Sequence, residues 1–363
     1  MLASAASYFG VKVSCLSPKA DDPAWVNSTI VVGNPKDTED VTHFGSNCDV
    51  VTVEFDDADV EGLRRLKEMG KIVHPNPDAL AIIQDKGLQS EFYQAHELPT
   101  PRFELLDSPE DVRKAVADGR WSFPFVLKTR RAGYDGKGVS VLQCHEDLNK
   151  VTGEGWVAQT KVDIHQELAV IAIRNGRGEV KVYPATELVA FDGAYLLDHL
   201  LVPADVSPSL EKKVASVAEQ LITDLDIQGL LAVEFFIDKA GELWINEVSP
   251  RPHNTGHQTI ESGLSSQYDQ HLRGILNLPL GEVEQHGPSA MLNILGEPGH
   301  SGPTKVEGMD EVLAMKGVKV HLYGKMETKP YRKMGHVTIL AEDRPTLMKR
   351  IQLVRNTLKV VSE

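Results

Sequence analysis

The architecture of this chain follows from one segment, GLLAVEFFIDKAGELWINEVSPRPHNTGH, which spans residues 229–257. Two apolar runs, 230–237 and 243–248, flank a short polar turn, and this pattern predicts a β-hairpin. If the loop is residues 239–242, the two strands pair antiparallel in one fixed register. The pairs are Asp238 with Leu243, Phe236 with Ile245, and Glu234 with Glu247.

Two carboxylates directly across a strand pair repel each other. A cation between them would remove the repulsion, and Mg²⁺ commonly takes one or two carboxylates together with nucleotide phosphates. A hairpin at a sheet edge with one exposed glutamate explains the same pattern. The rigid polar segment 250–254 leaves the second strand where a site would lie, so the sequence favours a magnesium–nucleotide site.

Composition excludes several classes of protein. With 363 residues we expect two or three domains with ample cores. The net charge of −14 argues against non-specific nucleic-acid binding. No apolar run approaches the ~20 residues of a membrane helix. The three cysteines, Cys15, Cys48 and Cys144, are far apart, which fits neither a disulfide framework nor a zinc site. We therefore expect no nucleic-acid and no membrane partner.

A glycine-rich segment follows a predicted strand at 125–128. Gly133, Gly136 and Gly138 would let backbone N–H groups approach a phosphate closely, and Lys137 adds a compact charge. The segment is not a Walker A loop, because Arg131 stands where glycine is required. A plain β-turn is the alternative to a mobile lid over a triphosphate.

Periodicity predicts further elements that frame these motifs. We expect helices at 2–9, 60–69, 79–95, 211–225, 259–275 and 344–357. We expect strands at 11–16, 30–32, 50–55, 71–74, 125–128, 139–142, 156–162, 167–173, 290–295, 319–323 and 336–340. A strand and glycine-rich turn normally open such a domain. Because the chain starts on a helix, we expect that strand to be missing.

These motifs, with residues 1–336 around them, resemble the 5-(carboxyamino)imidazole ribonucleotide synthetase family of ATP-grasp enzymes. The family includes the front half of fused eukaryotic phosphoribosylaminoimidazole carboxylases. The resemblance implies an α/β ATP-grasp fold in three domains. These would be a truncated Rossmann-like pre-ATP-grasp domain at 1–78, an ATP-grasp domain at 79–283 with a lid at about 121–185, and a small α+β domain at 284–363.

The resemblance also implies an activity. This is the ATP- and bicarbonate-dependent carboxylation of 5-aminoimidazole ribonucleotide to 5-(carboxyamino)imidazole ribonucleotide through carboxyphosphate, in purine biosynthesis. ATP and Mg²⁺ would be the cofactors. A homodimer is implied, with the mutase step on another chain or in a missing domain. The expected location is the cytoplasm, or a plastid if a transit peptide preceded the chain.

The resemblance implies a set of nucleotide contacts that extends from the predicted helix at 79–95 to the hairpin. The set is Lys86, Lys128, Gly133, Tyr134, Gly136, Lys137, Gly138, Gln159, Thr160, Lys161, Val162, Glu167, Asn246 and Glu247. Residues 156–162 would form the hinge that holds adenine, and Glu167 would bind the ribose hydroxyls. Glu234 and Glu247 would hold Mg²⁺. Gln159 stands where relatives usually carry glutamate, a change that leaves backbone bonding to adenine intact.

The substrate contacts implied by the resemblance come from three segments. Arg251, His253 and Asn254 would surround phosphate and bicarbonate. Asp135, beside Tyr134, would face the imidazole ribonucleotide. Lys325 and Arg332, seven residues apart, match the family's ribonucleotide-binding pair.

A zinc site is the alternative for the spacing of His253 and His257. We do not expect one, because no HExxH glutamate and no third ligand accompany them.

Two other functions fit parts of the sequence. Formate-dependent glycinamide ribonucleotide transformylase shares the EVSPRPH run, but Asn254, His257, residues 134–135 and residues 332–336 favour the carboxylating enzyme. A non-catalytic ATP-binding subunit is the second alternative. Its motivation is the absent first strand together with Ser90, Gln159 and Ala190, which depart from the family pattern.

Overall fold

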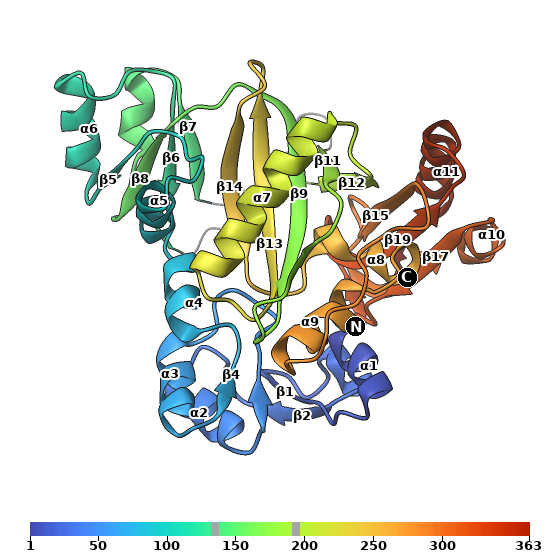
Figure 1. Ribbon diagram of the computed structural model, residues 1–363. Helices are drawn as coiled ribbons and strands as arrows, with labels where there is room; N and C mark the ends of the chain where they lie inside the picture. The colour runs from blue at the N-terminus through green and yellow to red at the C-terminus, as the bar shows by residue number, and fades with distance from the viewer. Residues whose placement is uncertain (132–137, 191–196) are drawn as a thin grey trace.

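The structure is a computed structural model that describes residues 1–131, 138–190 and 197–363. Its centre is a nine-stranded sheet in the order β14-β13-β9-β11-β12-β15-β19-β17, with β10 paired to β9 (Figure 1). Neighbouring strands in it run antiparallel. The strands are β9 (Ile164–Arg174), β10 (Val180–Val182), β11 (Thr186–Ala190), β12 (Leu197–Val202), β13 (Gly229–Asp238), β14 (Leu243–Ser249), β15 (Ser289–Leu295), β17 (Val318–Leu322) and β19 (Lys333–Leu340).

Helix α7 (Pro208–Asp224) lies across β9 and β13 (Figure 1). Its apolar stripe, which includes Val214 and Leu221, packs on Leu231 and Val233 of β13. The alternate residues of β13 are also buried, and Leu230 packs in a separate cluster. A strand buried on both faces has a continuous apolar sequence, which explains the run at 230–237.

A second sheet of four antiparallel strands, in the order β5-β8-β6-β7, lies beside the β14 edge (Figure 1). Helices α4 and α5 connect it to the N-terminal region. The elements are α4 (Pro77–Ile83), α5 (Lys86–Ala95), β5 (Phe103–Leu106), α6 (Pro109–Ala117), β6 (Phe125–Thr129), β7 (Val139–Leu142), η3 (His145–Lys150) and β8 (Trp156–Thr160). Strand β8 leads through residues 161–163 into β9, so the chain crosses directly from this sheet to the central one.

The N-terminal region alternates short parallel strands with helices, as predicted for an α/β domain. Strand β1 pairs with β2, and β3 pairs with β4. The elements are α1 (Leu2–Ala6), η1 (Ser7–Phe9), β1 (Ser14–Ser17), η2 (Pro23–Val26), β2 (Thr29–Val32), α2 (Thr38–Ser46), β3 (Val50–Val51), α3 (Val60–Glu68) and β4 (Ile72–Val73). Leu63 and Leu66 of α3 lie in the core of this region.

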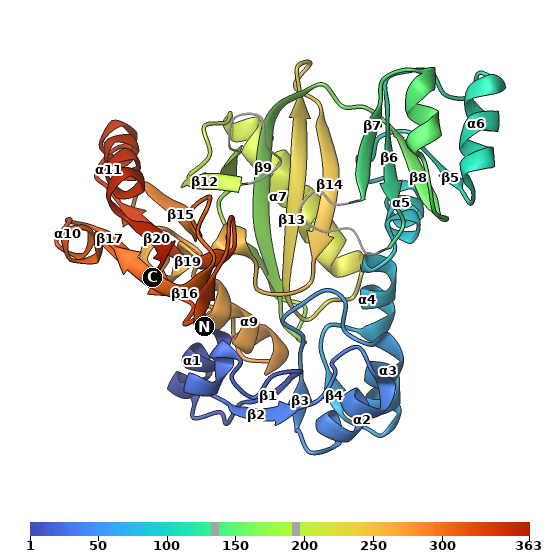
Figure 2. The ribbon, with the colours of Figure 1, turned by 180° about the vertical axis from the view of Figure 1, so that it is seen from behind.

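The C-terminal region continues the central sheet, because β12 pairs with β15. Helix α11 and a small sheet, in the order β18-β16-β20, complete it (Figure 2). The remaining elements are η4 (Asn254–Gly256), α8 (Thr259–Ser262), α9 (Gln267–Ile275), β16 (Gly302–Glu307), α10 (Met309–Leu313), β18 (Glu327–Thr328), α11 (Arg344–Thr357) and β20 (Lys359–Ser362). No helix in the described part of the chain is long and apolar enough to cross a membrane.

Two predicted helices are wrong in extent. The helix expected at 79–95 is split into α4 and α5, because Asp85 adopts an extended backbone and its carboxylate accepts from the N–H groups of Gly87 and Leu88. The helix expected at 259–275 is split into α8 and α9, where the Ser266 hydroxyl caps α9. The strand expected at 50–55 has only Val50–Val51 in a ladder. Periodicity continues through such breaks, whereas side-chain caps decide where each helix begins.

Candidate active site

The hairpin of β13 and β14 places Glu234 directly opposite Glu247, as the sequence predicted. Nearer the turn the predicted pairs, Phe236 with Ile245 and Asp238 with Leu243, are wrong. The observed partners are Phe235 with Ile245, Phe236 with Trp244, and Ile237 with Leu243.

The predicted register near the turn is wrong for two reasons, and their effects on the pairing cancel at Glu234 and Glu247. The turn is shorter by one residue than assumed, because the Asp238 N–H donates to the Glu242 carbonyl and Gly241 takes a left-handed conformation with φ of 83°. A bulge at Asn246 then adds one residue to β14. The bulge restores the pairing of the carboxylates and re-aims the strand next to them.

The Glu234 carboxyl lies in a strongly perturbed environment. Burial raises the pKa of Glu234 to about 8, and the negative charges of Glu247 and Glu167 add to the effect. A hydrogen bond from Asn246 and the positive charge of Lys333 act in the opposite direction. A metal cation, or a proton, would therefore be strongly favoured at this position.

Lys128 brings a cation to the same place from the other sheet. Its Nζ donates to Oδ1 of Asn246 at 3.4 Å. Burial lowers the pKa of Lys128 to about 8, the charge of Glu247 opposes the shift, and Lys86 adds to it. Strand β6 thus faces the hairpin with a lysine whose charge depends on the anions beside it.

The first turn of α5 is fixed to the end of β6. The Lys86 N–H donates to the Arg130 carbonyl at 2.8 Å. The Arg130 guanidinium donates two hydrogen bonds of 2.9 Å to Asp85, the capping residue of α5. Lys86 and Lys128 are thereby held together at the start of the glycine-rich segment. Gly138 has φ of 80°, while the predicted Gly133, Tyr134, Asp135, Gly136 and Lys137 lie outside the described residues.

The predicted hinge connects the two sheets. Gln159 is buried in β8 between Phe103 and Val126, whereas Thr160 and Lys161 are exposed and Val162 is half-buried.

Glu167 lies close by on β9, opposite Phe236 of β13. Burial raises the pKa of Glu167, and its charge acts on Glu234. This carboxyl group therefore borders the same site as the hairpin.

The tail after β14 is locked by hydrogen bonds. Arg251 donates to both carboxylate oxygens of Asp56, with Nε to Oδ1 at 2.9 Å and Nη2 to Oδ2 at 2.6 Å. The Nε2 atom of His253 lies 3.9 Å from Oε1 of Glu234, and its Nδ1 lies 2.9 Å from the Thr255 hydroxyl. Burial, with the nearby charge of Arg251, lowers the pKa of His253 and keeps it neutral. Asn254 begins η4 beside them.

The predicted ribonucleotide residues lie on the loop between β17 and β19. The Nζ atom of Lys325 donates to the Lys333 carbonyl at 2.7 Å, and Nη1 of Arg332 donates to the Glu327 carbonyl at 2.6 Å. Burial lowers the pKa of Lys325, with a contribution from Arg332. The charge of Lys333 acts on both Glu234 and His253, so this loop adjoins the hairpin.

Two residues at this site were missed by the sequence reasoning. Asp56 lies in the N-terminal region and pairs with Arg251 only through the fold, so no local pattern could indicate it. Lys333 stands beside Arg332 within a run that the sequence did single out, and that adjacency was the available signal.

A zinc site is not formed by the described residues. Among residues 1–131, 138–190 and 197–363, no three His, Cys, Asp or Glu side chains gather as a metal site. The Nδ1 atom of His257 instead lies 2.9 Å from the Tyr268 hydroxyl and 3.0 Å from Nε2 of Gln267.

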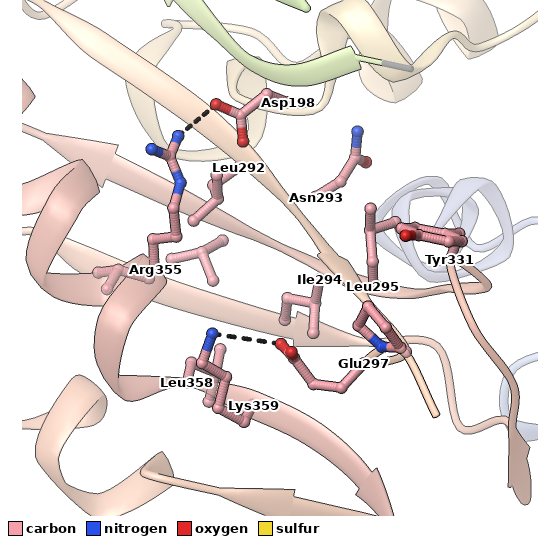
Figure 3. Close-up of a pocket in the computed structure, with 14 residues that line it drawn as sticks. Asp198, Leu292, Asn293, Ile294, Leu295, Glu297, Tyr331, Arg355, Leu358 and Lys359 are labelled. Atoms are coloured by element: carbon pink, nitrogen blue, oxygen red, sulfur yellow. Dashed lines mark hydrogen bonds and ion pairs between the residues drawn. The ribbon is translucent and has the colours of Figure 1, made fainter. Parts of the chain in front are cut away.

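A cavity of about 250 Å³ lies elsewhere, between β15 and α11 (Figure 3). Asp198 pairs with Arg355 on one side of it, and Glu297 lies 3.3 Å from Lys359 on the other. None of the predicted site residues that the structure describes lines this cavity. The candidate active site is therefore the group of residues around Glu234, Glu247 and Lys128, between the two sheets.

Comparison with known proteins agrees with this architecture. Three family models match: a ribonucleotide synthetase preATP-grasp domain at residues 1–84, an ATP-grasp domain at 91–268, and a phosphoribosylaminoimidazole carboxylase C-terminal domain at 289–350. The N5-carboxyaminoimidazole ribonucleotide synthase of Bacillus subtilis is 32% identical over 352 residues, which cover 94% of this chain and 88% of that protein.

A plant relative is longer. The chloroplastic phosphoribosylaminoimidazole carboxylase of Vigna aconitifolia is 35% identical over 350 residues, which cover 94% of this chain but 62% of that protein. The present chain therefore spans less than two thirds of its length.

Solved structures give the same result. The N5-carboxyaminoimidazole ribonucleotide synthetase of Thermotoga maritima superimposes with a TM-score of 0.90 at 36% identity, covering 100% of this chain and 96% of that one. The Aspergillus clavatus synthase in complex with ADP and 5-aminoimidazole ribonucleotide has a TM-score of 0.88 at 28% identity, covering 98% of this chain and 94% of that one. The fold, the matched domains and the extent of these alignments agree, and the chain belongs to the N5-carboxyaminoimidazole ribonucleotide synthase family.

Proposed function

We propose that this protein uses ATP and bicarbonate to carboxylate 5-aminoimidazole ribonucleotide to its N5-carboxyamino form, a step of purine biosynthesis. The observation that carries the proposal is the pairing of Glu234 with Glu247 beside Lys128, next to the loop that bears Lys325. The names of the relatives and the nucleotides in their complexes support the same activity.

The carboxylates of Glu234 and Glu247 fit Mg²⁺. They offer hard oxygen ligands, and the raised pKa of Glu234 reflects a carboxylate that is buried beside other carboxylates. Two protein carboxylates match the number that magnesium takes when phosphates and water complete its shell. When bound, the ion would supply charge neutralisation for the triphosphate.

The nucleotide would lie between the two sheets. We assign Lys86 and Lys128 to its phosphates, together with the glycine-rich segment 133–138. The backbone of residues 159–162 would bind adenine, and Glu167 would bind the ribose hydroxyls. A negative triphosphate would raise the lowered pKa of Lys128, so binding of the nucleotide and protonation of this lysine are coupled.

Bicarbonate would bind beside the γ-phosphate. Its oxygen attacks phosphorus, ADP leaves, and the resulting carboxyphosphate breaks down to CO₂ and phosphate. We assign Arg251 to orient these anions, and we place His253 and Asn254 beside them. The neutral His253 is able to accept a hydrogen bond but adds no charge. The exocyclic amine then attacks CO₂ and loses a proton, which gives the carbamate.

The ribonucleotide would be held by its phosphate. Lys325 and Arg332 present two cations on one loop, which suits a phosphate monoester. We assign Asp135 and Tyr134 to the imidazole ribonucleotide. Closure of the glycine-rich segment over both substrates would keep water from the labile carboxyphosphate.

The wider assignments rest on the same family membership. We propose domains at 1–78, 79–283 and 284–363, with the lid at about 121–185. We further propose a homodimer in which another chain or domain performs the following mutase step.

Phosphate release is the direct test. The purified chain is incubated with Mg²⁺ and ATP, with and without bicarbonate and 5-aminoimidazole ribonucleotide. We expect phosphate release that requires bicarbonate and rises with the ribonucleotide, together with formation of the carbamate. Tight ADP binding without bicarbonate-dependent release would instead identify a non-catalytic subunit. Release that depends on formate and glycinamide ribonucleotide would identify the transformylase activity.

A further inference from the structure

Three histidine rings lie in a stack where the helices after β14 meet the C-terminal strands. The centroids of His257 and His336 are 4.7 Å apart with an interplanar angle of 30°. Those of His336 and His321 are 4.5 Å apart with an angle of 13°. His257 follows η4, whereas His336 and His321 belong to β19 and β17, so the stack joins two distant parts of the sequence.

Each ring is anchored by one hydrogen bond or more. Nδ1 of His257 lies 2.9 Å from the Tyr268 hydroxyl of α9. Nε2 of His321 lies 2.6 Å from Oε1 of Glu261 on α8. In the middle of the stack, Nδ1 of His336 lies 3.0 Å from the Tyr323 hydroxyl. The outer rings thus bind the helices, and the central ring binds the segment that precedes Lys325.

The central ring is retained at a cost to stability. His336 is 0% exposed, and its Nε2 has no hydrogen-bond partner among the described residues. Burial strongly lowers the pKa of His336, and neighbouring His257 and His321 lower it further, so the ring is neutral. A buried unpaired polar atom destabilises the folded state, whereas an apolar ring of similar shape would not. The benefit of a histidine here must come from its other nitrogen, which fixes Tyr323.

The histidine stack is close to the candidate active site at two points, through His257 and through Tyr323. His257 lies in the same segment as His253, which faces Glu234. On the other side, Nζ of Lys325 lies 5.7 Å from the centroid of the Tyr323 ring. A shift of Tyr323 would therefore move the proposed phosphate-binding lysine relative to the hairpin.

We propose that His257, His336 and His321 form a positioning stack that holds the Tyr323–Lys325 segment at a fixed place relative to the hairpin and thereby sets the affinity for the ribonucleotide phosphate. These are positioning residues, because they act through Tyr323 and Lys325. The inference rests on the proposed function, since it assigns the ribonucleotide to this loop.

The test is a double-mutant cycle on the bond between His336 and Tyr323. We expect Tyr323→Phe and His336→Phe each to raise the KM for the ribonucleotide about fivefold, the ratio that corresponds to a hydrogen bond of about 1 kcal/mol. The KM for ATP should change less than about twofold. The double variant should be no worse than either single variant, because both remove the same bond.

Tyr183→Phe is the matched control. The Tyr183 hydroxyl is also buried and donates to the Ser265 carbonyl at 2.7 Å, away from the stack. It should lower the melting temperature without changing either KM. If Tyr323→Phe lowers stability and leaves the ribonucleotide KM unchanged, the stack is only structural, and that conclusion holds even if His336→Phe proves insoluble. Wild-type protein that shows no ribonucleotide-dependent release refutes the proposed function instead.

Discussion

The hairpin and the ribonucleotide loop, which form the two halves of the candidate site, are built in different ways. In the hairpin, Glu234 and Glu247 lie on adjacent strands joined by one tight turn, so hydrogen bonding within a single segment brings them together. In the loop, the ammonium group of Lys325 donates to the carbonyl of Lys333 at the start of β19, and the nearby Tyr323 contacts a stack of rings from distant segments. Local pairing brings together the proposed metal-binding groups, and tertiary packing places the proposed substrate cations beside them.

The largest expected effect comes from the hairpin. Glu247→Ala should reduce kcat/KM for ATP about a thousandfold, because the variant loses a carboxylate that holds the cation on the phosphates. Initial rates of phosphate release at subsaturating ATP, with bicarbonate and the ribonucleotide saturating, measure this. The variant should stay folded and still bind the ribonucleotide, which separates the two halves. Glu242→Ala, at the exposed turn of the same hairpin, is the control and should be fully active. Turnover near wild type in Glu247→Ala would remove the metal assignment.

A smaller effect is expected from a substitution in the loop that bears Lys325, and it should appear in the KM for the ribonucleotide. Lys325→Ala should raise the KM for the ribonucleotide about tenfold or more, because a charge-assisted hydrogen bond to phosphate is lost. The KM for ATP should change little. Lys329→Ala, an exposed lysine of the same loop, is the matched control and should behave as the wild type. An unchanged ribonucleotide KM in Lys325→Ala would mean that the phosphate binds elsewhere.

Weakening the ion pair between Arg251 and Asp56 should have a moderate effect on bicarbonate binding. Asp56→Asn removes one of the two carboxylate oxygens that hold the guanidinium, so Arg251 loses its fixed orientation. We expect the KM for bicarbonate to rise about fivefold, as for the loss of about 1 kcal/mol. Asp57→Asn, whose exposed carboxylate pairs with Lys36, controls for a general change of charge. Equal bicarbonate KM values in both variants would contradict the role given to Arg251.

The buried Glu234 carboxyl should make stability depend on pH when neither nucleotide nor metal is bound. The folded-state pKa of Glu234 is raised to about 8, so the folded protein binds more protons than the unfolded chain between the two pKa values. The contribution of Glu234 to stability is therefore fully present below its unfolded pKa of 4.5 and is lost as the pH rises through about 8. Glu234→Gln should be more stable than the wild type by roughly 1–3 kcal/mol above pH 8. The difference should become small near pH 5, just above the ordinary pKa of 4.5.

Urea denaturation at both pH values measures this difference, and comparison with the wild type cancels the titration of other groups. Saturating Mg²⁺ and ATP should reduce the advantage of the variant, because the bound cation then neutralises the wild-type carboxylate. A difference between the two proteins that is independent of pH would contradict the assigned ionisation of Glu234.

Much of the fold was predictable because it depends on short-range pattern. The residue range of α11 is as predicted, and most strands overlap their apolar runs. The break after α4 was not predicted, because an extended Asp85 paired with Arg130 replaces the helix there. The register error near the hairpin turn has a similar origin, since a bulge at Asn246 has no signal in the alternation of apolar residues.

By itself, the sequence determined the kinds of groups at the site and that one hairpin carries both Glu234 and Glu247, because alternation and a turn are local signals. The two carboxylates pair directly because the shorter turn and the bulge at Asn246 offset each other, and alternation signals neither of them. Only the tertiary structure decided that Asp56 holds Arg251, that Lys128 faces the hairpin, and that three histidines stack beside the loop. These contacts join segments far apart in the chain, and their geometry is fixed by packing between sheets rather than by any local preference.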